Sequence, residues 1–128
     1  MTASPRSTEL TEVANGFLAA LEAAARTGER EPVYPFLAPD VEWVTPQREL
    51  VGVDKIRREL TWADPPDKLD LEFERGELVE LGEGRVSSEV RQVYTLKATG
   101  EFAYTRLRRV ELTVRDGKVS RYEMRSVG

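Results

Sequence analysis

The side chains that most often carry out catalysis are missing from this sequence. Its 128 residues include no histidine and no cysteine. The chain therefore lacks the commonest general base, the Ser–His and Cys–His pairs, and the commonest metal ligand. Any catalysis must use Asp, Glu, Tyr, Arg or Lys.

The same absences limit metals and cofactors. Without His and Cys we predict no transition-metal site, although the sequence leaves carboxylate-bound magnesium or calcium open. The Gly82-Glu83-Gly84 run comes nearest to a phosphate-binding loop, but it lies in a predicted hairpin and not before a helix. We therefore predict no cofactor and no metal.

Two arginines occupy unexpected positions in a long predicted strand, Phe102–Val114. Tyr104 and Val110 share one face of that strand, and the apolar residues on this face predict that it packs on helices. Arg106 and Arg108 fall on the same face. Either a β-bulge turns them outward, or they reach into a pocket or its rim.

The elements that would position these side chains change type near Asp67. Before it, apolar residues recur at helical spacing; after it, they alternate with polar residues. Asp116-Gly117 is the strongest hairpin signal, and Asp64-Pro65-Pro66 should break the last helix. Helices followed by a meander of strands indicate an α+β domain with the helices on one face of an antiparallel sheet. We predict helices over residues 8–27, 32–37 and 52–63, and strands over residues 41–44, 69–73, 86–96, 102–114 and 119–127.

Composition narrows the class of protein. The chain has 19 basic and 23 acidic residues, for a net charge of −4, which disfavours nucleic-acid binding. No apolar run approaches the roughly 20 residues of a membrane-spanning helix, and the first residues lack the apolar segment of a signal peptide. We predict a cytoplasmic protein with no nucleic-acid or membrane partner. Its single domain would span residues 8–128, after a disordered tail over residues 1–7.

Two stretches of the sequence resemble the SnoaL-like branch of the nuclear-transport-factor-2-like superfamily. The resemblance covers nearly the whole chain after residue 8. It implies a cone-shaped half-barrel, in which a curved antiparallel sheet wraps around N-terminal helices and a pocket opens between them. It also implies a homodimer formed through the outer face of the sheet. The stretches are FLAPDVEWVTPQRELVGVDKIRREL and VELTVRDGKVSRYEM, with Phe36, Asp40-Val41, Trp43, Gly52 and Asp116-Gly117-Lys118-Val119 matching the family pattern.

The resemblance also implies that the known catalytic sets of the superfamily are replaced. Ketosteroid isomerases use a tyrosine, a carboxylate base and a second aspartate, where this chain has Phe17, Thr45 and Val110. Phe and Val cannot donate a hydrogen bond to an oxyanion, and Thr is no base near neutral pH. The last-strand aspartate of limonene-epoxide hydrolases falls at Met124. SnoaL-type cyclases use a pocket acid, and the late strands place no aspartate on a pocket-facing position.

The pocket implied by the resemblance would be lined by aromatic and polar side chains. A strand Trp or Tyr more often fills a core than touches a ligand, but an apolar pocket with a few convergent polar groups is typical of a ligand site. An arginine at its mouth would suit a weakly acidic ligand. The candidate ligand-binding residues are Trp43, Thr45, Trp62, Gln92, Tyr94, Tyr104 and Tyr122, with Arg106 or Arg108 at the mouth.

Three functions stay open from the sequence. The first is a SnoaL-like homodimer that binds a small apolar or weakly acidic metabolite. The second is an isomerase, cyclase or hydrolase with an unfamiliar acid–base pair, such as Glu42 or Glu123 with Tyr104 or Arg106. The third is a non-enzymatic dimerisation or interaction domain, whose pocket is filled by its own side chains.

Overall fold

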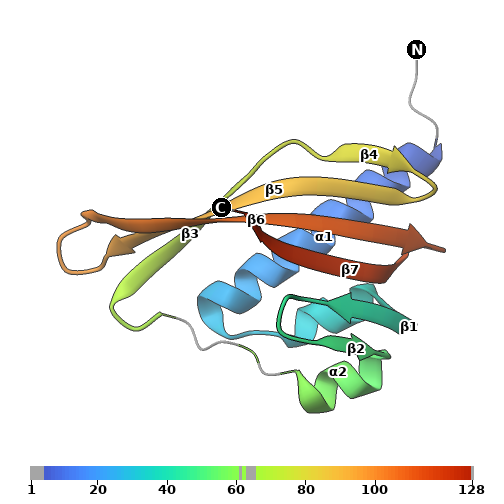
Figure 1. Ribbon diagram of the computed structural model, residues 1–128, viewed down its shortest axis with the longest axis horizontal. Helices are drawn as coiled ribbons and strands as arrows, with labels where there is room; N and C mark the ends of the chain where they lie inside the picture. The colour runs from blue at the N-terminus through green and yellow to red at the C-terminus, as the bar shows by residue number, and fades with distance from the viewer. Residues whose placement is uncertain (1–4, 61, 63–65, 128) are drawn as a thin grey trace.

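The computed structural model describes residues 5–60, 62 and 66–127, with side chains from residue 9 onward. A long helix lies against a curved sheet, with two short helices at one side (Figure 1). The α+β class predicted from the sequence is confirmed. The elements are α1 (Pro5–Thr27), the 3-10 helix η1 (Glu31–Phe36), β1 (Leu37–Val44), β2 (Glu49–Val51), α2 (Val53–Glu59), β3 (Leu69–Arg75), β4 (Val79–Gly82), β5 (Arg85–Leu96), β6 (Phe102–Arg115) and β7 (Lys118–Val127).

The described strands form one seven-stranded sheet in the order β2-β1-β7-β6-β5-β3, with β4 paired to the start of β5. All neighbouring strands are antiparallel except β1 and β7, which run parallel. The predicted meander of long strands is therefore confirmed, and the sheet is unclosed. No helix among the described residues is long and apolar enough to cross a membrane.

The core lies between α1 and the concave face of the sheet. The apolar stripe of α1 buries Ala14, Phe17 and Leu18, as its helical spacing predicts. Gly28 ends the helix with φ of 84° and donates its N–H to the Ala24 carbonyl at 2.9 Å, which is a common way to close a helix. On the sheet side the largest fully buried side chains include Leu112 and Val86.

The observed elements differ from the predicted ones mainly at their ends. Helix α1 begins at Pro5, before the expected caps Ser7 and Thr8. Residues 1–4 of the predicted tail, like Asp64 and Pro65 of the predicted helix break, lie outside the described residues. The three-residue β2 and four-residue β4 were not predicted, because strands this short carry too few alternations to show a period.

The register of β6 decides where its arginines point. Pairing with β5 is continuous from Tyr94↔Tyr104 to Arg85↔Thr113. The register between the two strands shifts outside this stretch, between Tyr94 and Thr95. The bulge alternative is therefore wrong, and Arg106 and Arg108 keep the parity of the concave face. Tyr104 itself, expected to pack on the helices, is 39% exposed, because the β5–β6 hairpin extends past the end of α1 (left in Figure 1).

Candidate functional site

The side chains that point inward from β5, β6 and β7 change from apolar to polar along the strands. Near the β6–β7 turn, Val86, Leu112 and Tyr122 lie opposite one another in neighbouring strands and are buried. Toward the other end of β6 the same face becomes polar. We call the side chains there the concave polar patch: Gln92, Tyr94, Tyr104, Arg106, Arg108 and Ser126.

Two tyrosines stack within the concave polar patch. Tyr94 and Tyr104 face each other across β5 and β6, with ring centroids 4.5 Å apart and planes at 18°. The Arg106 guanidinium lies 5.7 Å from the centroid of the Tyr104 ring, within the range of a cation–π contact. Burial raises the pKa of the Tyr94 phenol, Tyr104 adds to the rise, and Arg106 and Arg108 oppose it. Tyr94 is thus a neutral hydrogen-bond donor near pH 7.

Arg108 bonds to β7, and its charge influences the ionisation of Tyr122. Its guanidinium donates a hydrogen bond to the Ser126 hydroxyl on β7, the residue directly opposite. Burial raises the pKa of the Tyr122 phenol far above its ordinary value of 10.0, and the charge of Arg108 partly opposes this rise. Tyr122 therefore stays protonated, and its hydroxyl makes no hydrogen bond to any other described residue.

An aromatic cluster adjoins Tyr122 on the β1 side. Trp43 lies 4.4 Å from Tyr122 between ring centroids, and Phe17 packs edge-on against both. Trp62 continues the cluster at 6.0 Å from Trp43 and contacts Tyr34 at 6.4 Å. Trp43, Phe17 and Tyr122 are buried and Trp62 is half-buried. The cluster thus runs from the core toward solvent.

The predicted candidate residues fall into three places. Gln92, Tyr94, Tyr104, Arg106 and Arg108 come together in the concave polar patch. Trp43, Trp62 and Tyr122 belong to the adjoining aromatic cluster. Thr45 differs from both groups, because its hydroxyl exchanges hydrogen bonds with the backbone of Arg48 in the β1–β2 turn.

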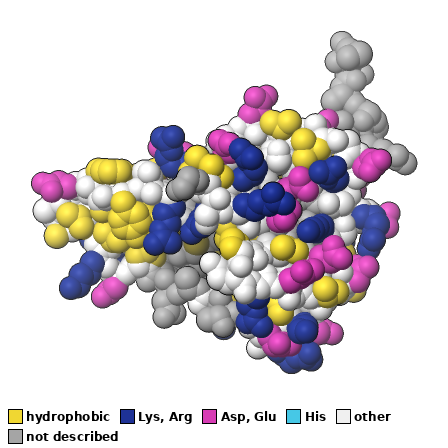
Figure 2. All heavy atoms as spheres, in the orientation of Figure 1, with side chains coloured by type: hydrophobic (Ala, Val, Ile, Leu, Met, Phe, Trp, Pro, Cys, Tyr) yellow, Lys and Arg dark blue, Asp and Glu magenta, His cyan; other side chains and the backbone are white. Residues whose placement is uncertain are grey.

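The convex face of the sheet carries paired charges. Glu42 and Glu123 lie on this face, and both contact Arg121, at 3.7 and 4.0 Å. Neither carboxylate is therefore placed beside Tyr104 or Arg106, and the acid–base pairs considered from the sequence are not assembled. Basic and acidic side chains are interspersed over the right part of the face in Figure 2, and hydrophobic ones gather at its left. Other pairs on the convex face are Arg85–Glu111 (3.2 Å), Arg109–Glu89 (2.9 Å) and Arg125–Glu123 (2.9 Å).

Three polar residues at the helix–sheet boundary were missed by sequence reasoning. Ser126 shares the parity of Tyr122, which is the signal that could have found it. Arg75 continues the inward parity of β3, and its Nε lies 2.9 Å from Glu22 Oε2 on α1. Burial raises the pKa of the Glu22 carboxyl, while Arg75 and then Arg26 oppose the rise. No sequence pattern pairs residues 22 and 75.

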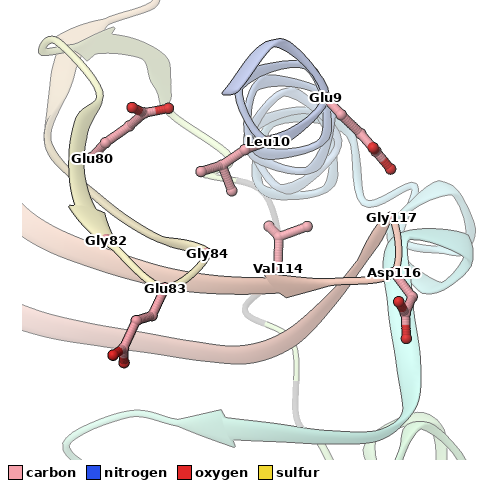
Figure 3. A pocket seen from close by; sticks show the side chains of 9 residues that line it. All are labelled: Glu9, Leu10, Glu80, Gly82, Glu83, Gly84, Val114, Asp116 and Gly117. Carbon is pink, nitrogen blue, oxygen red and sulfur yellow. The ribbon is translucent and has the colours of Figure 1, made fainter. Parts of the chain in front are cut away.

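Three grooves are present elsewhere in the described part of the molecule. One groove, about 630 Å³, lies between the N-terminal part of α1 and the β4–β5 and β6–β7 turns. Figure 3 shows Leu10 and Val114 pointing toward one another across it, whereas Glu83 and Asp116 point away. Neither this groove nor any other part of the described chain contains a group of three His, Cys, Asp or Glu side chains that could hold a metal ion. The other two grooves, of about 660 and 440 Å³, lie against the convex face and the β3 edge.

Comparison with known proteins identifies the fold. No protein-family model matches the sequence, and no curated protein matches it. Solved structures do match. A nuclear-transport-factor-2-like protein from Anabaena variabilis is 17% identical, with a TM-score of 0.70, over 100% of this chain and 95% of that chain. A ketosteroid isomerase-like protein from Erwinia carotovora atroseptica is 17% identical, with a TM-score of 0.64, over 98% and 99%.

A third match is TerC, co-crystallised with polyporic acid. It is 23% identical, with a TM-score of 0.63, over 91% of this chain and 89% of that chain. At these identities the matches establish the fold. The chain has the nuclear-transport-factor-2-like fold, as its resemblance to the SnoaL-like branch implied, and the fold by itself does not fix an activity.

Proposed function

We propose that this protein, built on the nuclear-transport-factor-2-like fold, binds a small, largely apolar metabolite at the open end of its concave sheet face. The observation that carries the proposal is the continuity of the inward sheet face, on which the concave polar patch follows directly after the buried positions Val110 and Tyr122, and Tyr122 packs on Trp43. Ligand sites typically combine an apolar lining with a few convergent polar groups. Both parts are present here, the polar groups on β5, β6 and β7 and the aromatic cluster beside them.

A polar group at this end is available to a ligand. Tyr94 is half-buried, and its phenol has no hydrogen-bond partner among the described residues. A protein-bound donor that is left without a partner gains from a ligand acceptor. TerC, which shares this fold, was co-crystallised with polyporic acid, and this supports small-molecule binding as a use of the fold.

A second candidate is a non-enzymatic interaction domain. The observation that favours it is the filling of the cone by Phe17, Trp43 and Tyr122, of which Phe17 is fully buried. In addition, the three described grooves are lined by residues outside this region. Under this alternative, the aromatic cluster is only a core, and no small molecule binds beside it.

An enzymatic role requires an acid–base pair other than those based on Glu42 or Glu123. Glu22 faces the sheet, and its raised pKa is typical of a general acid or base. Its contact with Arg75 at 2.9 Å is equally typical of a structural ion pair. We therefore rank binding ahead of catalysis.

The proposal includes a homodimer formed through the convex face. Such a dimer is expected from the SnoaL-like resemblance. The ion pairs of this face alternate in sign, so a two-fold related copy could place arginines against glutamates.

Tryptophan fluorescence tests the binding site directly. The chain has two tryptophans, and both belong to the aromatic cluster, with ring centroids 6.0 Å apart. A screen of apolar ketones, steroids, epoxides, polyketide fragments and small carboxylic acids should yield compounds that change this emission. The same compounds should raise the melting temperature, because saturation at 100 times Kd adds about 2.7 kcal/mol of stability.

A matched pair of variants localises the effect. Tyr104→Ala removes one ring of the stack and should weaken binding about fivefold to tenfold. Phe102→Ala removes a ring that is 65% exposed outside the patch, and it should leave the affinity unchanged. Equal losses in both variants, or no compound active in either assay, would contradict the proposed site and favour the interaction domain.

A further inference from the structure

Arg106 and Arg108 differ from the arginines of the convex face in having no acidic partner. Each of Arg85, Arg109 and Arg125 lies within 3.2 Å of a glutamate carboxylate. Among the described residues, Arg106 contacts the Tyr104 ring and Arg108 bonds the neutral Ser126 hydroxyl, and neither forms an ion pair. The two positive charges are thus uncompensated within the described part of the chain.

The strands around these arginines supply no compensating charge on the same face. The residues directly opposite in β5 are Gln92 for Arg106 and Val90 for Arg108. Across β7, Arg108 faces Ser126. Every aspartate and glutamate of β5, β6 and β7 takes the other parity and lies on the convex face. The sheet therefore separates one cationic surface from a balanced one.

Arg106 and Arg108 are neighbouring residues on the same face of β6. Residues two apart in a strand project from the same face at a spacing of about 7 Å, so two positive charges repel unless an anion lies between them. Arg106 rests against the face of Tyr104 at 5.7 Å, which leaves its N–H edge free. Planar guanidinium edges pair with carboxylates through two parallel hydrogen bonds.

The surroundings favour an anion attached to a flat apolar body. The Tyr94–Tyr104 stack, with planes at 18°, presents an aromatic face next to Arg106, and Tyr104 is 39% exposed. On the other side, Arg108 bonds the neutral Ser126 hydroxyl on β7. A carboxylate at the arginines would therefore lie next to ring surfaces on which a planar ligand can stack.

We propose that the ligand of this site is an aromatic carboxylate, whose carboxylate is bound by Arg106 and Arg108 and whose ring packs against the Tyr94–Tyr104 stack. This rests on the proposed function, because it names the chemical class bound at the same site. Gln92 and the Tyr94 phenol provide further polar contacts around the carboxylate.

Pairs of aromatic acids and their amides test the role of charge. Naphthoate with naphthamide, biphenyl carboxylate with its carboxamide, and anthracene carboxylate with its carboxamide differ in charge at nearly constant shape. Titrations followed by tryptophan fluorescence and calorimetry should give at least one pair in which the acid binds about tenfold or more tightly than the amide. Raising the salt concentration should lower the affinity for the acid and leave the affinity for the amide unchanged.

Three arginine variants test the residues. Arg106→Gln and Arg108→Gln should each lower the affinity for the acid about tenfold and leave the affinity for the amide unchanged. Arg109→Gln is the matched control, because Arg109 is next in β6 but pairs with Glu89 on the convex face at 2.9 Å, and it should change neither affinity. Circular dichroism of each variant confirms that it is folded.

The outcomes separate this inference from the proposed function. If acid and amide bind equally, or if Arg106→Gln and Arg108→Gln keep the preference for the acid, the carboxylate inference is overturned and the binding site stands. If no member of any pair binds, and the wider screen also yields no compound, both are overturned.

Discussion

Tyr122 is the residue at which the core meets the concave polar patch. Its ring packs between Phe17 and Trp43, with centroids 5.6 and 4.4 Å away, while its phenol lies near the charge of Arg108. The Tyr122 hydroxyl has no hydrogen-bond partner among the described residues, and it is not one of the fully buried unpartnered atoms found there.

The alkaline pH dependence of stability tests this description of Tyr122. Burial raises its pKa in the folded protein above the ordinary 10.0, so the phenol contributes stability that is present below pH 10.0 and lost as the pH rises further. Tyr122→Phe should change the free energy of unfolding near neutral pH by less than about 1 kcal/mol. It should also flatten the decline in stability measured by urea unfolding between about pH 9 and pH 11. Parallel curves for the variant and the natural protein would show that the phenol is not buried as described.

Individual residues also show what the sequence could and could not predict at this scale. The parity of Arg106 and Arg108 was visible in β6, and only the register excluded a bulge. The turn hydrogen bonds of Thr45 depend on β2, a strand too short to predict. The contact of Glu22 with Arg75 joins residues 53 positions apart (75 − 22), and no local pattern encodes it.

The β4–β5 turn sets the alignment of the sheet where it meets the end of β6. Gly84, with φ of 75°, lies so close to β6 that an added Cβ would stand 2.5 Å from the Val114 carbonyl oxygen. The Val114 N–H in turn donates to the Gly84 carbonyl at 2.8 Å. This turn therefore fixes how β4 and β5 sit beside β6, and Gly is required there for space as well as for conformation.

Two glycine variants separate space from conformation. Gly84→Ala should lower the free energy of unfolding by about 2–4 kcal/mol, because both the positive φ and the clash with Val114 add strain. Gly100→Ala should cost only about 1–2 kcal/mol, since Gly100 has nearly the same φ, 76°, with nothing within 4 Å of an added Cβ. Urea unfolding of both variants measures the difference. Equal losses would mean that the β4–β5 turn can move away from β6.

The whole molecule presents two faces of different electrostatic character. The convex face balances arginines with glutamates, whereas the concave face carries unpaired arginines beside aromatic rings. A face of paired, partly exposed charges gains little stability from each pair. Its regular alternation is more useful for matching a partner surface, which is the role that we propose for it in a homodimer.

Charge reversal on the convex face tests the homodimer. Arg109→Glu places an acidic residue opposite Glu89, and it should raise the dimer dissociation constant about tenfold or more. Lys97→Glu, at the exposed β5–β6 turn, changes the charge equally and should leave the dimer intact. Sedimentation equilibrium at several protein concentrations measures both. A natural protein that is monomeric at every concentration would exclude the dimer.

At the scale of the molecule, the sequence predicted the architecture better than the site. Long alternating strands and a single apolar helical stripe determine the α+β class, and the Asp116-Gly117 turn determines the last hairpin. The order of strands in the sheet was harder to predict, because the position of β1 next to β7 depends on contacts between residues about 80 positions apart. The function of the concave face depends on such contacts as well.

The parallel pairing of β1 with β7 also has a consequence for how the chain assembles. Strands β3 to β7 meet partners close in sequence, but Trp43 finds its neighbour Tyr122 only after β7 has been made. Contacts of long sequence separation form slowly, and a protein emerging from the ribosome folds from its N-terminal end. Trp43 can pack on Phe17 of α1 before β7 exists, but the sheet edge of β1 is completed only when β7 joins it, so the contact of Trp43 with Tyr122 is expected to mark a late step of folding.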